Sequence, residues 1–339
     1  MHASTTPQRD TYWDTIKALL IFLVVLGHAV QHFMYMAKDS MDFWSDPVFK
    51  GIYIFHMPLF MLISGFFAAK SISKHGRASV LRYLQRLALP CVGMGLIFLV
   101  LTPPNESFFR SFYDGCRFLW FLIVVFECVI FYLIMQLGRS TWYKAAMFIF
   151  PIPFAIFYKN APDVLQFFPH KYQFTYLWPF FVLGTSLSHL KFTPQQIDKK
   201  WLIFPILYIA AYYLFQPGWY VYRCPLTFDV NNILVDTYRT LAAICGCGTA
   251  MWAGKYIHPF IGKYSIIQNI GRATLAIYVL QTLFFLQYKL IASYFPQSPG
   301  YIGNIILSCI ILAALYLIYI TTRRIPIAGA LLYGEIKRK

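Results

Sequence analysis

Long apolar segments recur along the whole chain, and they constrain its fold more than any other feature. A helix of about 20 apolar residues crosses the hydrocarbon core of a bilayer. About ten windows of that length occur, near residues 13–34, 48–69, 80–101, 117–137, 141–158, 172–190, 201–216, 237–255, 267–290 and 302–322. Because backbone polar groups in lipid must be satisfied internally, such segments fold as helices. The sequence therefore predicts an all-α, polytopic membrane helix bundle with about ten transmembrane helices.

The composition agrees with a membrane protein. Hydrophobic residues make up 59% of the 339 residues and charged residues only 12%, whereas soluble domains carry about 25% charged residues. A formal net charge of +16 on a soluble protein would suggest nucleic acid. In a polytopic protein, positive charge normally lies in the cytoplasmic loops, so we expect the lipid bilayer, and no nucleic acid, as the partner.

The loop charges indicate an orientation. Lysine and arginine concentrate in alternate loops and in the C-terminal tail, whereas the other loops hold most of the acidic residues. By the positive-inside rule, this asymmetry places both termini in the cytoplasm of a cell with the chain in its cytoplasmic membrane. The longest connection, from Gln216 to Asp236, is too short for a soluble domain. Residues 1–339 are therefore predicted to form a single integral membrane domain.

The first apolar segment carries ionisable residues that are costly to place in hydrocarbon. Asp14 and Lys17 lie near its start and His28 lies near its end; each such group costs roughly 2.5–3.5 kcal/mol on insertion scales. Lys17 and His28 are eleven positions apart, so on a helix they share one face, about 16 Å apart along the axis. A lone histidine usually packs against a backbone carbonyl, but Lys17 on the same face favours a functional reading of His28.

Further polar residues lie at a similar depth. Gln31 and His32 follow His28 at helical spacing, and His32 is expected near the outer interface, in water. His56 precedes Ser64 and Gly65 in the second span, and Glu127 lies within the fourth. Gly65 would let another backbone or a ligand approach. Convergence of His28, His56 and Glu127 on one polar cavity would be their cheapest arrangement. His56 would then be a base, a substrate donor, or the partner that fixes the tautomer of His28.

Cations cluster at the cytoplasmic end of the third span. Arg82 and Arg86 are four residues apart and so present a pair of guanidinium groups suited to phosphate. Arg77 and Arg272 would enlarge this basic mouth, although ordinary positive-inside charge explains an isolated pair as well. Trp120 begins the fourth span, where tryptophan is a common interfacial anchor.

Several blocks, in order along nearly the whole chain, resemble the acyltransferase-3 superfamily of integral membrane O-acyltransferases, and most closely its fucose 4-O-acetylase-like branch. They are Lys17 with His28, the Phe-His-Met-Pro-Leu-Phe…Ser-Gly-Phe block at 55–66, the arginines before Pro90, Leu-Trp-Phe-Leu at 119–122, Pro-Phe-Phe-Val-Leu-Gly at 179–184 and Ile-Gly-Arg-x-Thr-Leu-Ala-Ile-Tyr at 270–278. Two positions depart from the family pattern. Lys17 replaces a more widespread arginine, and Gln281 stands where related proteins often have histidine.

The resemblance implies transfer of an acyl group, commonly acetyl, from cytoplasmic acetyl-CoA to a sugar hydroxyl at the outer side. Acyl-CoA would be a co-substrate rather than a tightly bound cofactor, and the acceptor a cell-surface polysaccharide or lipid-linked glycan. The predicted catalytic residues are His28, Lys17, His56, Glu127 and Asp14, the CoA-binding residues Arg82, Arg86, Arg77 and Arg272, and the acceptor-binding residues Trp120, Gln31 and His32, with no metal.

The chemistry is consistent with these residues. O-Acylation needs a base for the hydroxyl proton, and imidazole suits that role near neutral pH; Glu127 or Asp14 would orient His28 or balance Lys17. Direct attack by the hydroxyl and an acyl-histidine intermediate both remain open.

Two other classes of protein stay open. A transporter of sugars or lipid-linked intermediates would also carry intramembrane ionisable residues, although no internal repeat is evident. A membrane scaffold would use the same polar residues for helix packing alone. The seven cysteines show no metal spacing, and a disulfide between Cys116 and Cys224, both in predicted outer loops, is a further open prediction.

Overall fold

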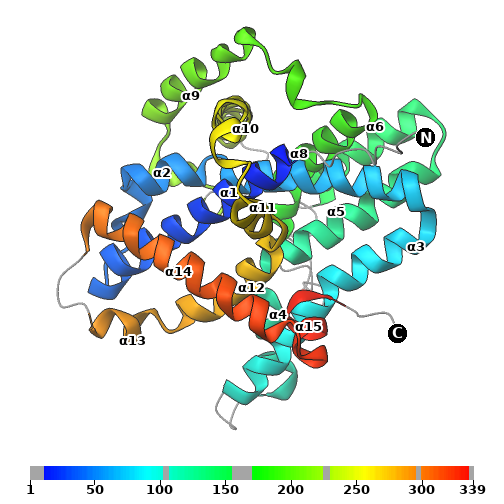
Figure 1. Ribbon diagram of the computed structural model, residues 1–339. Helices are drawn as coiled ribbons and strands as arrows, with labels where there is room; N and C mark the ends of the chain where they lie inside the picture. Colours follow the sequence, from blue (N-terminus) through cyan, green and yellow to red (C-terminus); the bar gives the residue numbers. More distant parts are fainter. Residues whose placement is uncertain (1–10, 102–106, 155–169, 224–229, 295–298, 336–339) are drawn as a thin grey trace, which may run out of the picture.

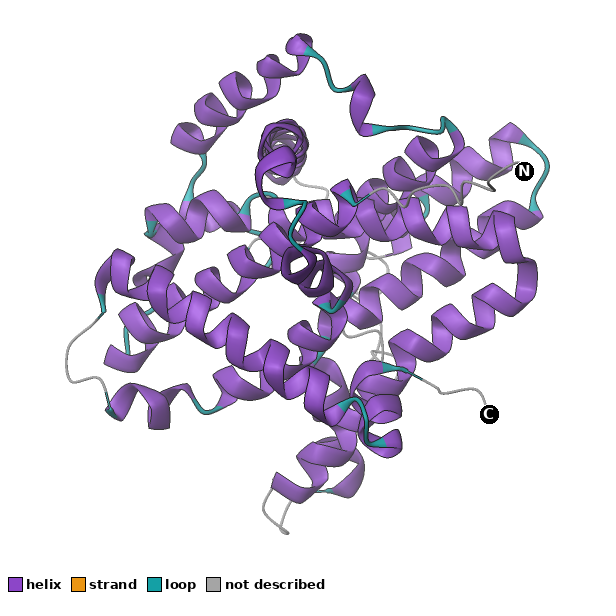
Figure 2. Cartoon of the chain, viewed as in Figure 1, coloured by secondary structure: helices purple, strands orange, loops and turns teal. Residues whose placement is uncertain are grey.

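The described part of the chain is helical throughout (Figures 1 and 2). The computed structural model describes residues 11–101, 107–154, 170–223, 230–294 and 299–335. Within these ranges it contains fourteen α-helices and no strand. The predicted all-α, polytopic helix bundle is therefore confirmed.

The first half of the chain forms six of the described α-helices. They are α1 (Tyr12–Ala29), α2 (Pro47–Tyr53), α3 (His56–Leu101), α4 (Phe108–Phe118), α5 (Trp120–Leu137) and α6 (Thr141–Ile149). A π-helix, Val30–Tyr35, continues α1, and short 3₁₀ segments follow at Met36–Lys38 and Asp42–Ser45. Asp46 then starts α2 by accepting a hydrogen bond from the Phe49 amide at 2.8 Å, with Pro47 at the first helical position, both ordinary helix-start signals.

The helices of the second half complete the bundle. They are α8 (Lys171–His189), α9 (Ile203–Leu214), α10 (Val230–Ile261), α11 (Ser265–Arg272), α12 (Thr274–Leu286), α13 (Tyr288–Ser293), α14 (Gly300–Thr322) and α15 (Pro326–Tyr333). Short 3₁₀ segments lie at Pro194–Gln196, Lys199–Leu202 and Pro217–Trp219. The predicted loop from Gln216 to Asp236 extends too far toward the C-terminus, because α10 already begins at Val230.

Five helical segments in the described ranges are long and apolar enough to cross a membrane. They are Tyr12–Lys38, Pro47–Lys74, Val80–Leu101, Trp120–Leu137 and Gly300–Thr322, and α11 with α12, bent by 71° at their junction, would make a sixth. The other predicted spans coincide with α6, α8, α9 and α10, although residues 155–158 of one span lie outside the described residues. The structure thus shows five or six candidate spans of a multi-pass membrane protein.

A sharp bend divides α3 into two arms (Figure 1). It lies at Gly76, whose φ of 57° and ψ of −147° are not helical and which strain any residue with a Cβ atom. The arms correspond to the predicted spans 48–69 and 80–101. The bend returns the chain beside itself, so that both arms face the same interior.

The first arm of α3 crosses α8 with the two backbones in contact. A Cβ atom on Gly65 would collide with the backbone carbonyl of Phe181, and one on Gly184 with that of Leu62. Small residues at helix crossings allow such close approach in membranes. Of the two alternatives predicted for Gly65, the approach of another backbone or of a ligand, the structure shows the backbone. Trp178 and Phe181 of α8 are fully buried beside this crossing.

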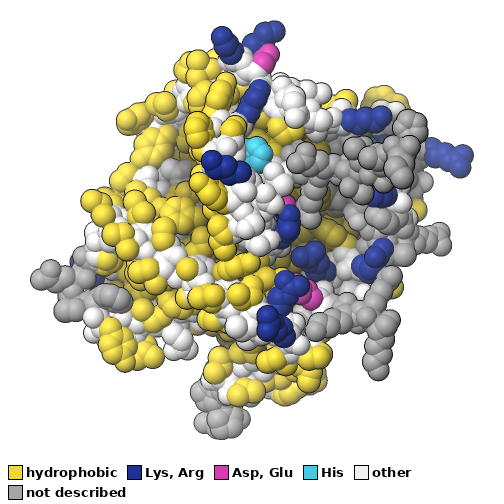
Figure 3. Space-filling model, in the orientation of Figure 1, with side chains coloured by type: hydrophobic (Ala, Val, Ile, Leu, Met, Phe, Trp, Pro, Cys, Tyr) yellow, Lys and Arg dark blue, Asp and Glu magenta, His cyan; other side chains and the backbone are white. Residues whose placement is uncertain are grey.

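Apolar side chains cover much of the outer surface. Trp142 and Phe109 have 85% and 81% of their surface exposed, as expected where helices face lipid rather than water. Figure 3 shows hydrophobic side chains over the left of this face, with lysine and arginine toward its middle and right.

Candidate functional site

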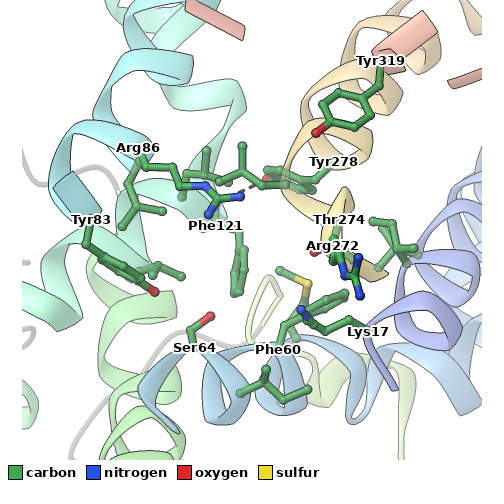
Figure 4. A pocket seen from close by; sticks show the side chains of 18 of the residues that line it. Lys17, Phe60, Ser64, Tyr83, Arg86, Phe121, Arg272, Thr274, Tyr278 and Tyr319 are labelled. Atoms are coloured by element: carbon green, nitrogen blue, oxygen red, sulfur yellow. Dashed lines mark hydrogen bonds between the residues drawn. The ribbon is translucent and has the colours of Figure 1, made fainter. Parts of the chain in front are cut away.

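A cavity of about 510 Å³ lies between α1, both arms of α3, α5, and the bent pair α11 and α12 (Figure 4). This volume falls within the roughly 300–1,000 Å³ typical of small-molecule sites. Its basic lining residues are Lys17, Arg86, Arg272 and Arg323, its hydroxyl groups come from Ser64, Tyr83, Thr274, Tyr278 and Tyr319, and Phe60 and Phe121 are among its apolar walls. In Figure 4, Arg86 points into the cavity from the side opposite Lys17 and Arg272.

Asp14 holds two of these cations in place. Its carboxylate lies 2.8 Å from Nζ of Lys17 and 3.3 Å from Nε of Arg272, and only 2% of its side chain is exposed. Arg272 reaches Asp14 because Gly271 has no side chain. A Cβ atom there would collide with the carbonyl of Asp14. Asp14 therefore balances Lys17, one of the two roles predicted for it, and the same carboxylate also orients Arg272.

Of the predicted arginine pair of the third span, one member lines the cavity. Arg86 is among the lining residues and Arg82, one turn earlier, is not, although both side chains are exposed. That the pair binds phosphate stays a prediction. Arg272 is where the prediction placed it, at the basic mouth. The side chain of Arg77 lies outside the described residues.

The C-terminal segment adds a part of the cavity that sequence reasoning missed. Arg323 and Glu335 both line it, with Nε of Arg323 3.4 Å from the carboxylate of Glu335. The hydroxyl of Tyr319 donates to the same carboxylate at 2.6 Å. In the sequence Arg323 belongs to the basic C-terminal tail, and its distance from Lys17 along the chain gives no sign that α14 packs against α1.

The cavity follows one face of α1 toward His28. Lys17, Ile21 and Val24 line it in succession, at the spacing of one helical face, and His28 is the next residue of that row. The predicted alignment of Lys17 and His28 is thus confirmed by a regular helix over Tyr12–Ala29. His28 itself lies one turn beyond the residues that line the cavity.

His28 is held by two polar side chains at the junction of α1 and the π-helix. Its Nδ1 lies 3.2 Å from Oε1 of Gln31 and 3.4 Å from the hydroxyl of Tyr53. An amide oxygen only accepts hydrogen bonds, so this contact assigns the ring proton to Nδ1. The Nε2 lone pair is then the basic position of His28. Tyr53 was not predicted, although it lies one turn before His56 in sequence.

His56 is fixed by the backbone instead of by His28. Its Nδ1 donates to the carbonyl of Ile52 at 2.9 Å, and the residue is buried. The ring of Tyr53 packs against both histidines, 4.6 Å from His56 and 6.3 Å from His28 between ring centroids. The side chain that contacts Nδ1 of His28 and so sets its tautomer is Gln31. The prediction that His56 plays this part is therefore wrong.

His32 packs among aromatic rings. Its ring lies 4.6 Å from Tyr288, 5.1 Å from Phe285 and 5.9 Å from His28, centroid to centroid. The expectation that His32 is solvated is therefore wrong, because α12 and α13 cover it.

Glu127 does not join the two histidines within the described structure. Phe121, Leu122 and Val125 are the residues of α5 that line the cavity, and helical geometry places Glu127 roughly 160° around the helix from them. The predicted convergence of the three residues on one polar cavity is therefore not seen. His28 and His56 both contact Tyr53, but neither is among the residues that line the cavity. The rotation of α5 about its axis, which the sequence leaves open, decides the position of Glu127.

Gln281 lies on α12 between Tyr278, which lines the cavity, and Phe285, which contacts His28. It is 1% exposed, and its amide atoms have no hydrogen-bond partner among the described residues. The open prediction of a disulfide involves Cys224, which lies outside the described residues; Cys116 is a free thiol.

Comparisons with known proteins agree with this geometry. Residues 10–323 match the acyltransferase 3 family, described as an acyltransferase domain. Nodulation protein NolL of Mesorhizobium japonicum is 28% identical over 304 residues, which cover 81% of this chain and 76% of that protein. Nodulation protein NolL of Sinorhizobium fredii is 34% identical over 188 residues, 52% of this chain and 48% of that protein.

No solved structure matches the chain. The family match nevertheless spans most of its length, from α1, with Lys17 and His28, to the end of α14. The chain therefore belongs to the acyltransferase 3 family and is a multi-pass membrane acyltransferase.

Proposed function

We propose that this enzyme transfers an acetyl group from cytoplasmic acetyl-CoA to a sugar hydroxyl of a cell-surface polysaccharide or lipid-linked glycan. The observation that carries the proposal is the basic cavity along α1. It begins at Lys17 and ends one turn before His28. The resemblance to the fucose 4-O-acetylase-like branch supports a sugar as the acceptor.

The charge of the cavity suits the phosphates of coenzyme A. Lys17, Arg86, Arg272 and Arg323 face two carboxylates, Asp14 and Glu335, which leaves two positive charges in excess. Arginine binds phosphate through paired hydrogen bonds. In this proposal Arg86, Arg272 and Arg323 hold the phosphates, and Lys17, fixed by Asp14, lies at the entrance to the path of the pantetheine arm.

The length of the path fits the donor. Lys17 and His28 are eleven positions apart on α1, about 16 Å of helix, which is of the order of an extended pantetheine arm. With the phosphates at the basic end, the thioester reaches the level of His28 and the adenosine remains at the cytoplasmic mouth.

The chemistry then needs one proton to move twice. Nε2 of His28 takes the proton of the sugar hydroxyl as its oxygen attacks the thioester carbonyl. The tetrahedral intermediate collapses, the carbon–sulfur bond breaks, and the leaving CoA thiolate takes up the proton from the imidazolium. Gln31 and Tyr53 hold the ring, and His56, fixed by Ile52, supports Tyr53 from the other side. Glu127 has no part in this mechanism.

We further propose ten spans in the cytoplasmic membrane, with both termini in the cytoplasm and residues 1–339 forming one domain. Helices α6, α8, α9 and α10 lie on the predicted spans that are not among the five candidates. This orientation puts the basic cavity at the cytoplasmic end of α1, where acetyl-CoA is available.

The test is transfer of labelled acetyl from acetyl-CoA to glycan in membranes that contain the wild type or His28→Ala, with mass spectrometry of the surface glycans. We expect an acetyl mass on the glycan with the wild type and a loss of at least about 100-fold in His28→Ala. His189→Ala, which removes a histidine bonded to Tyr132 at 3.0 Å, is the matched control. Full transfer by normally expressed His28→Ala would refute the proposal, and label on His28 after a rapid quench would replace direct attack by an acyl-histidine route.

A further inference from the structure

A second hollow, of about 580 Å³, lies beside α3, α4 and α5, and the donor cavity does not account for it. Phe98, Asp114, Arg117, Phe118, Trp120 and His170 line it. Only Trp120 among them was predicted to bind the acceptor. We call this space the outer vestibule, because α5 begins at Trp120 and in the proposed orientation runs inward from there.

Trp120 connects the outer vestibule with an aromatic cleft. The cleft is lined by Trp120, Tyr222, Tyr53 and Met57, among others, and the rings of Trp120 and Tyr222 lie 5.7 Å apart. Tyr53, at the other end of the cleft, has its hydroxyl 3.4 Å from His28. Met57 also lines the donor cavity. The cleft thus brings Trp120 of the outer vestibule and Tyr53, the partner of His28, to one space.

The outer vestibule combines an aromatic surface with polar groups. Trp120 lies 6.2 Å from the ring of His170, centroid to centroid, and Asp114 lies 3.6 Å from Arg117. Nε2 of His170 is buried and has no hydrogen-bond partner in the described part of the chain. Apolar walls with a few placed polar groups are typical of small-molecule sites. An aromatic face accepts the weakly positive C–H face of a sugar ring, while the polar groups take its hydroxyls.

Charge selects among the sugars. Asp114 balances Arg117. Arg110 lies 3.9 Å from the same carboxylate, but its side chain is exposed and does not line the outer vestibule. Burial, with the nearby Arg117 cation, lowers the pKa of His170 from 6.5 to about 4. The imidazole is therefore neutral at neutral pH, and the lining residues carry no net charge. A site without excess positive charge has no means to offset the desolvation of a carboxylate or phosphate, so an uncharged sugar ring fits it better than a uronic acid.

We propose that the outer vestibule binds the acceptor as a neutral sugar ring stacked on Trp120, with Asp114, Arg117 and His170 as its polar contacts. This inference rests on the proposed function, because it assigns the acceptor side of the same reaction. The aromatic cleft, with a volume of about 20 Å³, lies between this sugar ring and the pair Tyr53 and His28.

The experiment measures sugar binding without catalysis. The full chain in nanodiscs is mixed with methyl α-L-fucopyranoside, and saturation-transfer NMR reports which ring protons contact the protein, with empty nanodiscs as the blank. We expect transfer to protons of one face of the ring, and apparent affinity about fivefold weaker in Trp120→Ala. Trp120→Phe, which keeps an aromatic face, retains most of the signal. Trp142→Ala, which removes a tryptophan 85% exposed on α6, serves as the matched control and leaves binding unchanged.

Each outcome decides one point. Equal binding by the wild type and a folded Trp120→Ala, or no binding by the wild type, overturns the outer vestibule as the acceptor site. Stronger binding of methyl β-D-glucuronide than of the fucoside overturns its neutral character. His28→Ala keeps the sugar signal while losing acyl transfer. If the wild type binds the sugar through Trp120 yet transfers no acetyl, the proposed function fails and the sugar site stands.

Discussion

The side-chain oxygen of Gln31 lies 3.2 Å from Nδ1 of His28, and this contact leaves Nε2 as the basic nitrogen of the ring. The amide nitrogen of Gln31 points the other way, 3.6 Å from the sulfur of Met36. The amide is therefore oriented with its oxygen toward the histidine. His28 lies in the last turn of α1, and Gln31 lies in the π-helix Val30–Tyr35 that continues it. The contact therefore forms where the helix changes type, and such π-helical turns often occur at functional sites.

Replacement of Gln31 by leucine should slow the chemical step. Loss of one hydrogen bond to the ring, worth about 1.4 kcal/mol, would lower kcat for acetyl transfer about tenfold and leave the KM for acetyl-CoA unchanged. Gln216→Leu, at an exposed position outside the site, controls for the change of residue type. Steady-state kinetics in nanodiscs decide the matter, and an unchanged kcat would show that Gln31 does not position His28.

Arg86 and Arg82 offer a comparison within one turn of the same helix. Only Arg86 lines the cavity, so Arg86→Gln should raise the KM for acetyl-CoA about tenfold, and Arg82→Gln by less than about threefold. The effect of Arg86→Gln should disappear with S-acetyl-pantetheine, which lacks the nucleotide phosphates. Equal effects of the two substitutions on acetyl-CoA would contradict the assignment of Arg86 to those phosphates.

The crossing of α3 and α8 should tolerate no side chain at Gly65. In Gly65→Ala the new Cβ atom meets the carbonyl of Phe181, and such overpacking costs about 1–3 kcal/mol. Gly218→Ala is the matched change, because a Cβ atom there meets nothing within 4 Å. We expect a lower thermal unfolding midpoint in detergent for Gly65→Ala only. Identical midpoints would mean that the helices separate at this point at no cost.

The proposed orientation can be tested by cysteine accessibility. In a cysteine-free background, Ser40→Cys should react with a membrane-impermeant maleimide added to intact cells. Arg324→Cys should react only after the membrane is permeabilised, because the positive-inside rule places that end in the cytoplasm. Reaction of Arg324→Cys in intact cells would reverse the orientation and move the basic cavity to the outside.

Features that depend on one helix were predictable. Lys17 and His28 share a face of α1 because helical periodicity alone fixes their relative direction. The close approach at Gly65 and the basic mouth around Arg272 also followed from local residue types. The family resemblance then supplied a chemistry that the family match over residues 10–323 supports.

Features that depend on the rotation of one helix against another, or on how far along its axis the contact lies, were not predictable. Arg82 and Arg86 occupy similar positions in the sequence, yet only Arg86 lines the cavity. Glu127 lies at a suitable depth but on the opposite side of α5 from the cavity-lining residues. His32 is covered by Tyr288 and Phe285, which come from distant parts of the chain. Nothing in the local pattern of apolar residues specifies these rotations.

The sequence by itself thus determined an all-helical membrane protein, the direction of the face that joins Lys17 to His28, and the residue types that the chemistry needs. Hydrophobicity and helical periodicity are local properties, so they can be recognised in the sequence alone. The tertiary structure alone decided which cations enclose the cavity, that Tyr53 lies between the two histidines, and that Arg323 and Glu335 complete the basic end. Those relations arise from side-chain packing between helices far apart in sequence, where half a turn of rotation moves a residue from the cavity to the opposite side of its helix.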